Sequence, residues 1–387
     1  SHLDHEAVLQ RKNKVVKTLV TGVKGKLKAN KVTVVEGFAE IIGKNADGYL
    51  VRADQETFTG SRLLIATGSE PIMPAIPGLM ESYEKGYVLT NREILDLTAL
   101  PSSLVIVGGG VIGLEMASYF NSAGCKVTVI EMLDHIAGNT EREISEMLMK
   151  KYQKKGVEFK LGAKVVAIKQ GQVVYKLNSD TIASEASEAV PADKVLISIG
   201  RKPVTNGIGL ENIGIQLVKG RIVTDDSVKT NIPEVYAAGD VNGLSMLAHT
   251  AYREAEVAVN NMLGYQDFMR YGAIPAVIYT NPEVASVGET EASAIEKGID
   301  YEVAKISMRY SGRFIAENEA EDGICKLLID KKNQHLLGVH LLGNYASEII
   351  YGAGLMLETA MPIRDLKKLV FPHPTVSEII REALFEI

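Results

Sequence analysis

The sequence predicts an α/β protein that carries a separate α+β domain at its C-terminal end. From Leu104 onward, strand-like apolar runs alternate with helical periodicity, which is typical of parallel sheets. Past Gly272, short strand-like runs follow one another and helices come only at the end. The 387 residues are enough for two or three domains with a large buried core.

Composition excludes several classes of protein. Hydrophobic residues make up 46% and charged residues 23% of the chain, which is typical of a soluble globular protein. The net charge of −6 disfavours a nucleic-acid partner, because counterion release needs clustered positive charge. No apolar run approaches the ~18 residues of a membrane span, and the N-terminus shows no secretory signal. We therefore expect a cytoplasmic protein, or a mitochondrial matrix protein if a transit peptide was removed.

The first part of the chain predicts one long helix and several short strands. Residues 5–29 carry apolar side chains at helical spacing, which indicates an amphipathic helix. Prolines at 71, 74 and 77 then mark a linker. The expected strands between helix and linker are Val32–Val35, Ala39–Ile42, Tyr49–Arg52 and Arg62–Ala66.

The middle and last parts predict the two sheets. Helices are expected at about 112–123, 141–155 and 248–262, and two or three more should end the chain. The strands expected in the parallel part are Leu104–Val107, Lys126–Ile130, Glu158–Lys160, Val195–Ile199 and Val235–Ala238. Those expected in the C-terminal domain are Ala276–Tyr279, Glu302–Ile306, Gly323–Ile329 and Gly338–Leu342.

The two cysteines do not form a redox or metal motif. Cys125 enters a predicted strand and Cys325 lies within one, and neither has a second cysteine at Cys-x-x-Cys spacing. Both are interpreted as small buried hydrophobic residues. No metal site is predicted.

The strongest chemical signal is a glycine-rich turn between a strand and a helix. Gly108, Gly110 and Gly113 form G-x-G-x-x-G directly after Leu104–Val107. The first glycine permits the tight turn, the second lets backbone approach a pyrophosphate, and the third lets helix and strand pack closely. The anion would rest on N–H groups at the helix start, including those of Val111 and Ile112.

An acidic residue at the end of the next strand selects the nucleotide. Glu131 follows Lys126–Ile130, about 20 residues after the glycines. A carboxylate there accepts hydrogen bonds from a ribose diol and repels a 2′-phosphate. The sequence therefore predicts a Rossmann-like site for NAD rather than NADP. The alternative is a glycine-rich turn in an unrelated α/β fold.

Five motifs together resemble one enzyme family. The chain is similar to the flavin-dependent pyridine nucleotide–disulfide oxidoreductases, and most of all to the dihydrolipoamide dehydrogenases among them. The resemblance covers essentially the whole chain. The motifs, in order, are Ala66-Thr67-Gly68, the G-x-G-x-x-G unit, Gly200-Arg201-Lys202-Pro203, Ala238-Gly239-Asp240 with Met246-Leu247-Ala248-His249, and the segment His373 to Glu378.

The resemblance implies a domain order and a set of cofactor contacts. Residues 1–74 and 201–268 would belong to a FAD domain, 75–200 to an inserted NAD domain, and 269–387 to a dimerisation domain. The further NAD contacts that it implies are Glu115, Val165 and Gly200. The FAD contacts that it implies are Ala39, Thr67, Gly68, Ser69, Asp240, Met246, Leu247, Ala248 and His249.

The resemblance also implies a catalytic pair, His373 and Glu378, acting on the disulfide of the partner in a homodimer. A neutral imidazole can take a proton from a dithiol, and the carboxylate would orient the ring. The residues alone also allow a structural interpretation, because Thr375-x-x-Glu378 matches a capping box. Likewise, Glu115 near a helix start is equally well explained by the helix dipole.

The family's own FAD fingerprint and Cys-x4-Cys redox pair have no counterpart in the sequence. We therefore expect a parent activity of oxidising dihydrolipoamide and reducing NAD through FAD, serving lipoyl domains of 2-oxo acid dehydrogenase or glycine-cleavage assemblies. The chain as written is expected to lack that activity, since electrons have no path between dithiol and flavin. The alternatives are a truncated module that binds NAD and dimerises, an intact molecule whose full sequence is longer, and another NAD(P)-linked disulfide reductase.

Overall fold

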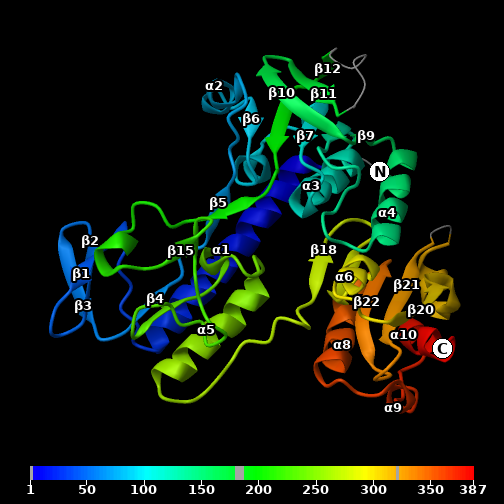
Figure 1. Cartoon of the computed structure of the whole chain (residues 1–387). Coiled ribbons are helices and arrows are strands. Elements are labelled where there is room, and N and C mark those ends of the chain that lie inside the picture. The colour runs from blue at the N-terminus through cyan, green and yellow to red at the C-terminus, as the bar shows by residue number, and fades with distance from the viewer. Residues whose placement is uncertain (1–2, 179–186, 320–321) are drawn as a thin grey trace. The chain divides into compact units, whose positions relative to one another are not determined.

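The chain folds into two compact units (Figure 1). The computed structural model describes residues 3–178, 187–319 and 322–387. The first unit combines Ser1–Ile72 with Gly200–Arg270, and the second combines Met73–Ile199 with Tyr271–Ile387. Each unit is therefore built from two stretches of chain that are distant in sequence.

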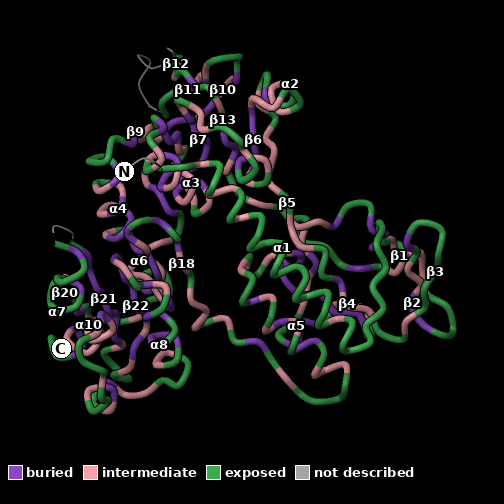
Figure 2. Tube along the Cα trace, turned by 180° about the vertical axis from the view of Figure 1, so that it is seen from behind, coloured by how far each residue is buried: buried purple, intermediate pink, exposed green. Residues whose placement is uncertain are grey.

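The first unit begins with the predicted long helix, α1 (His5–Ala29). Asp4 caps it, because its carboxylate accepts a hydrogen bond from the Ala7 N–H at 3.0 Å. The helix buries no residue, and its apolar side chains Val16, Leu19 and Val23 are 50–64% exposed. Figure 2 shows α1 in the colours of exposed and intermediate residues along its length. The helix is confirmed, and most of its apolar side chains are exposed.

Small sheets make up the rest of the first unit. β1 (Ala39–Lys44), β2 (Tyr49–Ala53) and β3 (Glu56–Gly60) form an antiparallel sheet. The parallel pair is β4 (Leu63–Ile65) with β17 (Val235–Ala237), which leads to α5 (Ala248–Met262). Two antiparallel pairs complete it: β5 (Ser69–Pro71) with β14 (Arg201–Pro203), and β15 (Leu217–Val218) with β16 (Arg221–Ile222).

One predicted strand in this unit is wrong, and five of its strands were not predicted: β3, β5, β14, β15 and β16. Val32–Val35 is irregular and exposed, and no strand of the described residues pairs with it. Apolar alternation alone does not make a strand without a partner. Conversely, Glu56–Gly60 is a polar edge strand whose alternation gave no apolar signal.

The second unit contains the predicted parallel sheet. Its order is β6-β13-β7-β8-β9, and every neighbouring pair is parallel. Two helices, α3 (Val111–Ser122) and α4 (Arg142–Lys154), confirm the strand–helix alternation. The strands are β6 (Val88–Leu89), β7 (Ser103–Val107), β8 (Lys126–Ile130), β9 (Glu158–Lys160) and β13 (Lys194–Ile197).

A three-stranded antiparallel sheet inserted in this part was not predicted. It consists of β10 (Ala163–Lys169), β11 (Gln172–Leu177) and β12 (Glu188–Pro191), and α2 (Leu79–Glu84) belongs to the same part. In β11, the buried Val173 and Tyr175 lie on either side of the half-buried Val174. Because apolar residues stand side by side in this way, the sequence shows no simple alternation of apolar and polar residues.

The C-terminal part of the second unit is an antiparallel sheet with the order β18-β19-β22-β21-β20. The strands are β18 (Ala276–Ile278), β19 (Val284–Gly288), β20 (Tyr301–Ser307), β21 (Ile324–Asp330) and β22 (Leu336–Leu342). The helices are α6 (Glu291–Glu296), α7 (Gly312–Glu317), α8 (Ala346–Glu358), α9 (Ile363–Leu366) and α10 (Glu378–Phe385). The four predicted strands are present, whereas β19 and the helices α6 and α7, which lie between strands, were not predicted.

The parallel sheet and the C-terminal sheet share a hydrophobic core. Ile278, Val284 and Leu342 of the C-terminal sheet belong to the same buried cluster as Ile106 and Val129 of the parallel sheet. Figure 2 shows buried residues running along the strands of both sheets. Within the described residues, no helix is both long and apolar enough to cross a membrane.

Candidate functional site

The glycine-rich turn has the geometry that its three glycines require. Gly108 adopts φ +108°, and a Cβ there would lie 2.2 Å from the Ser198 carbonyl oxygen. A Cβ on Gly113 would lie 2.3 Å from the Gly108 oxygen. A Cβ on Gly110, by contrast, would meet no atom of the described residues within 4 Å. Gly108 and Gly113 are therefore required by packing, whereas Gly110 keeps the backbone accessible from outside.

The start of α3 offers free donors beside Gly110. The first hydrogen bond within the helix runs from the Leu114 N–H to the Gly110 carbonyl at 3.0 Å, so the N–H groups of Val111, Ile112 and Gly113 precede it. No acidic side chain lies in the first turn, and Gly110 provides no side-chain cap. These N–H groups and the helix dipole favour an anion here.

Glu131 is fixed beside this turn by backbone hydrogen bonds. One carboxylate oxygen accepts from the Gly109 N–H at 2.6 Å, and the other accepts from the Leu133 N–H at 2.8 Å. The carboxylate is thus held against the glycine turn before any ligand arrives. Each oxygen keeps a second lone pair, which can accept a ribose hydroxyl.

The other residues implied for NAD have different surroundings. Glu115 accepts a hydrogen bond from the Tyr279 N–H at 2.9 Å, which ties α3 to the end of β18. Burial raises the pKa of the Glu115 carboxyl, and this N–H opposes part of the shift. Val165 is a buried core residue of β10. Gly200 belongs to the first unit, where its carbonyl accepts from the Ile72 N–H at 3.0 Å. Their roles toward NAD stay predictions.

Most of the residues implied for the flavin gather at two places in the first unit. At the first, the Ser69 hydroxyl donates to Asp240, and Arg201 Nε donates to the same hydroxyl oxygen at 2.7 Å. Arg201 also lies 3.9 Å from Asp240. Nearby, the Thr67 hydroxyl donates to the Val204 carbonyl at 2.7 Å. Asp240 is therefore part of a polar network that joins β5, β14 and the turn after β17.

The second place is the N-terminus of α5. Leu247 is the N-cap residue and makes no side-chain cap, and the first turn, which begins with Ala248 and His249, carries no acidic residue. Met246, Ala248 and His249 are exposed. Free N–H groups at a helix start stabilise negative charge on a neighbouring group. Ala39, the first residue of β1, is exposed and pairs with Ala53, so the sheet alone accounts for its position.

His373 and Glu378 are in direct contact, as expected for a catalytic pair. His373 Nδ1 lies 2.8 Å from Glu378 Oε1, and the imidazole is 78% exposed while the carboxylate is 18% exposed. The Thr375 N–H donates to the other carboxylate oxygen at 2.8 Å. This backbone hydrogen bond, with a smaller contribution from His373, lowers the pKa of Glu378. The carboxylate is therefore ionised at neutral pH.

The capping box that the sequence allowed is only half present. Helix α10 begins at Glu378 itself, and Ser377 is its N-cap residue without a side-chain cap. The Thr375 hydroxyl donates to the Pro372 carbonyl at 2.7 Å instead of serving the helix start. Only the bond from the Thr375 N–H to Glu378 resembles a capping box, so orientation of His373 is the clearer role of this carboxylate.

Two polar residues of the site were missed in the sequence. Arg201 holds Ser69 beside Asp240, and the Gly-Arg-Lys-Pro motif was its only signal. Glu254 is fully buried in α5 and accepts from the Gly239 N–H at 2.5 Å, directly before Asp240. Fully buried glutamates are rare, so the burial of Glu254 marks it as a residue of the site. The helical pattern of the sequence does not reveal that burial.

The cysteine interpretation is confirmed. Cys125 and Cys325 are both buried free thiols. Burial raises the pKa of the Cys125 thiol to about 11 and also raises the pKa of Cys325. Neither thiol is suited to attack or exchange at neutral pH.

Comparison with known proteins identifies the family. Residues 2–255 match the pyridine nucleotide-disulphide oxidoreductase model, and residues 274–384 match the dimerisation domain of the same family. The chain belongs to this family. It is accordingly an oxidoreductase, and it carries the dimerisation domain.

Curated relatives of the chain are mainly dihydrolipoyl dehydrogenases. The mitochondrial enzyme of Pisum sativum is 35% identical over 383 residues, covering 98% of this chain and 75% of the relative. The mitochondrial enzyme of Sus scrofa is 36% identical with the same coverage. The leghemoglobin reductase of Glycine max is 34% identical, covering 97% of this chain and 72% of the relative.

Solved structures show the same fold. The HOCl-induced flavoprotein disulfide reductase RclA from Escherichia coli superposes with a TM-score of 0.87 at 28% identity, covering 99% of this chain and 86% of that one. LpdA from Mycobacterium tuberculosis superposes with a TM-score of 0.89 at 24% identity, covering 100% and 84%. The mixed α/β fold expected from the sequence is thereby confirmed.

Proposed function

We propose that this oxidoreductase is a dihydrolipoyl dehydrogenase, which oxidises a dihydrolipoyl dithiol and reduces NAD with FAD as the intermediate carrier. The observation that carries the nucleotide part is the hydrogen bond between the Gly109 N–H and Glu131, which places a carboxylate against the glycine turn. The relatives named dihydrolipoyl dehydrogenase support the choice of the dithiol substrate.

Each cofactor has its own group of residues. NAD would lie with its pyrophosphate at the N–H groups after Gly110 and its adenosine ribose at Glu131. Asp240 would hold the ribityl chain of FAD, and the uncapped start of α5 would face the flavin ring. The flavin supplies the electron transfer between dithiol and nicotinamide when it is bound.

His373 would be the base that removes a proton from the dithiol. An ionised carboxylate can only accept, so the Nδ1 that faces Glu378 carries the ring proton. The basic lone pair is then on Nε2. Glu378 would also stabilise the imidazolium that forms after proton transfer. The dimerisation domain supports a homodimer in which this pair acts on the partner's disulfide. A lipoyl domain of an acyltransferase or of a glycine-cleavage carrier would present the dithiol.

A second candidate function is a dimeric NAD-binding module without dithiol chemistry. Two features support it: Glu131 is held against the glycine turn, and the dimerisation domain is present.

One set of measurements on the purified chain separates the candidates. Calorimetric titration with NADH should show binding, and Glu131→Gln should weaken it while Glu158→Gln on neighbouring β9 should not. Absence of NADH binding by a folded sample would refute both candidates. The dihydrolipoyl dehydrogenase would be established if the chain shows flavin absorbance and dihydrolipoamide:NAD turnover, and if this turnover is lost in His373→Gln. NADH binding and dimerisation without turnover would establish the second.

A further inference from the structure

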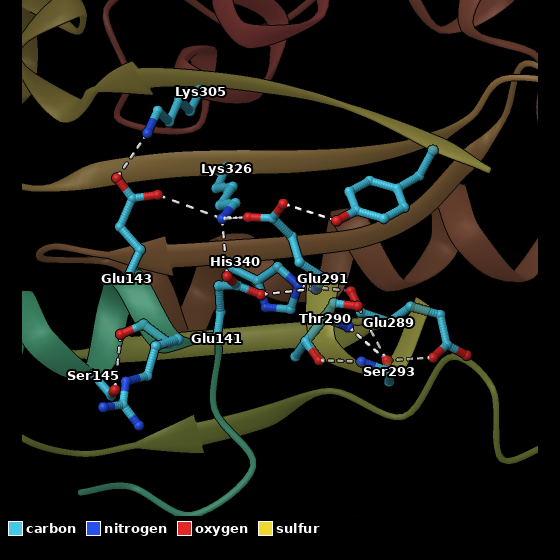
Figure 3. Close-up of polar contacts among 12 residues, drawn as sticks. Glu141, Glu143, Ser145, Glu289, Thr290, Glu291, Ser293, Lys305, Lys326 and His340 are labelled. Atoms are coloured by element: carbon cyan, nitrogen blue, oxygen red, sulfur yellow. Dashed lines mark hydrogen bonds and ion pairs between the residues drawn. The ribbon is translucent and has the colours of Figure 1, made fainter. Parts of the chain in front are cut away.

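A buried lysine lies at the centre of a charged cluster in the second unit (Figure 3). Lys326 of β21 is 2% exposed, and its ammonium lies 2.8 Å from Glu141 and 3.4 Å from Glu143. It also donates to Glu291 at the start of α6. Figure 3 shows the three carboxylates pointing toward the ammonium group, Glu141 and Glu143 from the start of α4 and Glu291 from α6. Glu141, itself only 4% exposed, is the most deeply buried of the three.

The lysine is held in place by its neighbours on the sheet. His340 of β22 is directly opposite Lys326 in the strand register. It is fully buried, and its Nε2 lies 2.8 Å from the Glu289 carbonyl, to which it donates. Its Nδ1 has no hydrogen-bond partner within the described chain. Burial lowers the pKa of His340, so the ring is neutral and Lys326 is the cation that compensates Glu141.

The cluster is connected to the nucleotide site by a short segment, Glu131–Glu141, which we call the strap. At its beginning, Glu131 accepts from the Gly109 N–H at 2.6 Å. In its middle, the Ala137 N–H donates to the Gly109 carbonyl at 2.8 Å. At its end, Glu141 accepts from Lys326 and, at 3.0 Å, from the Glu291 N–H. The strap therefore bonds to both sides of Gly109 and ends in the cluster.

We propose that Lys326 is a positioning residue for the nucleotide site, because it anchors the strap that holds Glu131 against Gly109. Without the ammonium group, Glu141 would be a buried carboxylate that lacks its cation, and the strap end would move toward water. Only three residues lie between Ala137 and Glu141, so this movement would loosen both bonds at Gly109. The Glu131 carboxylate can discriminate against a 2′-phosphate only while it is held in place beside Gly109. The inference rests on the proposed function, since it concerns the same NAD site.

The test compares Lys326→Met with Glu141→Gln and a matched control. Lys331→Met removes a lysine next to the end of the same strand, where it makes an exposed pair with Asp300 at 2.9 Å. Glu141→Gln keeps the size and acceptor oxygen of the side chain, and it decides the question if Lys326→Met does not fold. Two quantities are measured for each: hydrogen exchange of the Gly109 and Leu133 amides without nucleotide, and the Kd values for NADH and NADPH.

The expected result is faster exchange at both amides and a roughly 2- to 30-fold weaker affinity for NADH in the cluster variants. The ratio of the NADPH and NADH Kd values should fall, since repulsion of the 2′-phosphate weakens. The control should match the wild type in amide exchange and in both Kd values. A lower unfolding temperature with unchanged exchange and an unchanged Kd ratio would overturn the positioning role. Wild-type protein that does not bind NADH would instead refute the proposed function, and the inference with it.

Discussion

Replacing single glycines of the nucleotide turn separates the demands of folding from those of binding. Gly110 has φ −77° and ψ −175°, which alanine adopts without strain, and its Cβ would meet no atom of the described residues within 4 Å. Gly110→Ala should therefore leave the free energy of unfolding unchanged or raise it by about 0.4–1 kcal/mol, through the less flexible unfolded chain.

Gly108→Ala is the contrasting variant. Its φ of +108° is unfavourable for alanine, and the new Cβ would lie 2.2 Å from the Ser198 oxygen. The backbone strain costs about 1–3 kcal/mol, and the overpacking costs a similar amount, about 1–3 kcal/mol. For a folded unit of this size, the melting temperature should fall by about 5–20 °C.

Among the folded variants, the order of the effects on NADH binding should be the reverse of the order of the effects on stability. A methyl group on Gly110 would stand between the helix N–H groups and the pyrophosphate, and one lost charge-assisted hydrogen bond costs about 1.5–3 kcal/mol. The Kd for NADH should rise about 10- to 100-fold in Gly110→Ala. Calorimetry gives the Kd and differential scanning calorimetry gives the stability. Wild-type affinity in Gly110→Ala, or a Gly108→Ala protein as stable as Gly110→Ala, would refute the reasoning.

Three further predictions follow from the site. Glu131→Arg should shift the preference from NADH toward NADPH, measured as the ratio of the two Kd values, and an unchanged ratio would remove the role of Glu131. The lowered pKa of Glu378 means that its stabilising effect is present above the unfolded value of about 4.3 and is lost as pH falls through the lower folded value. Glu378→Gln should therefore flatten the acid limb of stability against pH below about 4, and an unchanged limb would contradict this. Cys125 and Cys325 should react with a thiol reagent only after denaturant is added, because both are buried with raised pKa values; rapid labelling of the native protein would show that a thiol is accessible.

The sequence alone determined the features that depend on neighbouring residues. The G-x-G-x-x-G turn, the strand before it and the helix after it are fixed by φ/ψ limits and by contacts within a few positions. For the same reason, α5 and the strands β8 and β9 were predicted with nearly the observed bounds. The burial of both cysteines followed from their apolar surroundings in the sequence.

The tertiary structure decided where polar side chains find their partners. Lys326 and Glu141 are 185 positions apart, and no local pattern indicates that the packing of α4 against the C-terminal sheet brings them within 2.8 Å. The network of Ser69, Arg201 and Asp240 likewise spans three separate segments. Val32–Val35 shows the converse, because this strand-like sequence is irregular and no strand of the described residues pairs with it. Hydrogen bonds and ion pairs between distant segments form only when packing places both partners together, and that placement depends on the whole folded chain.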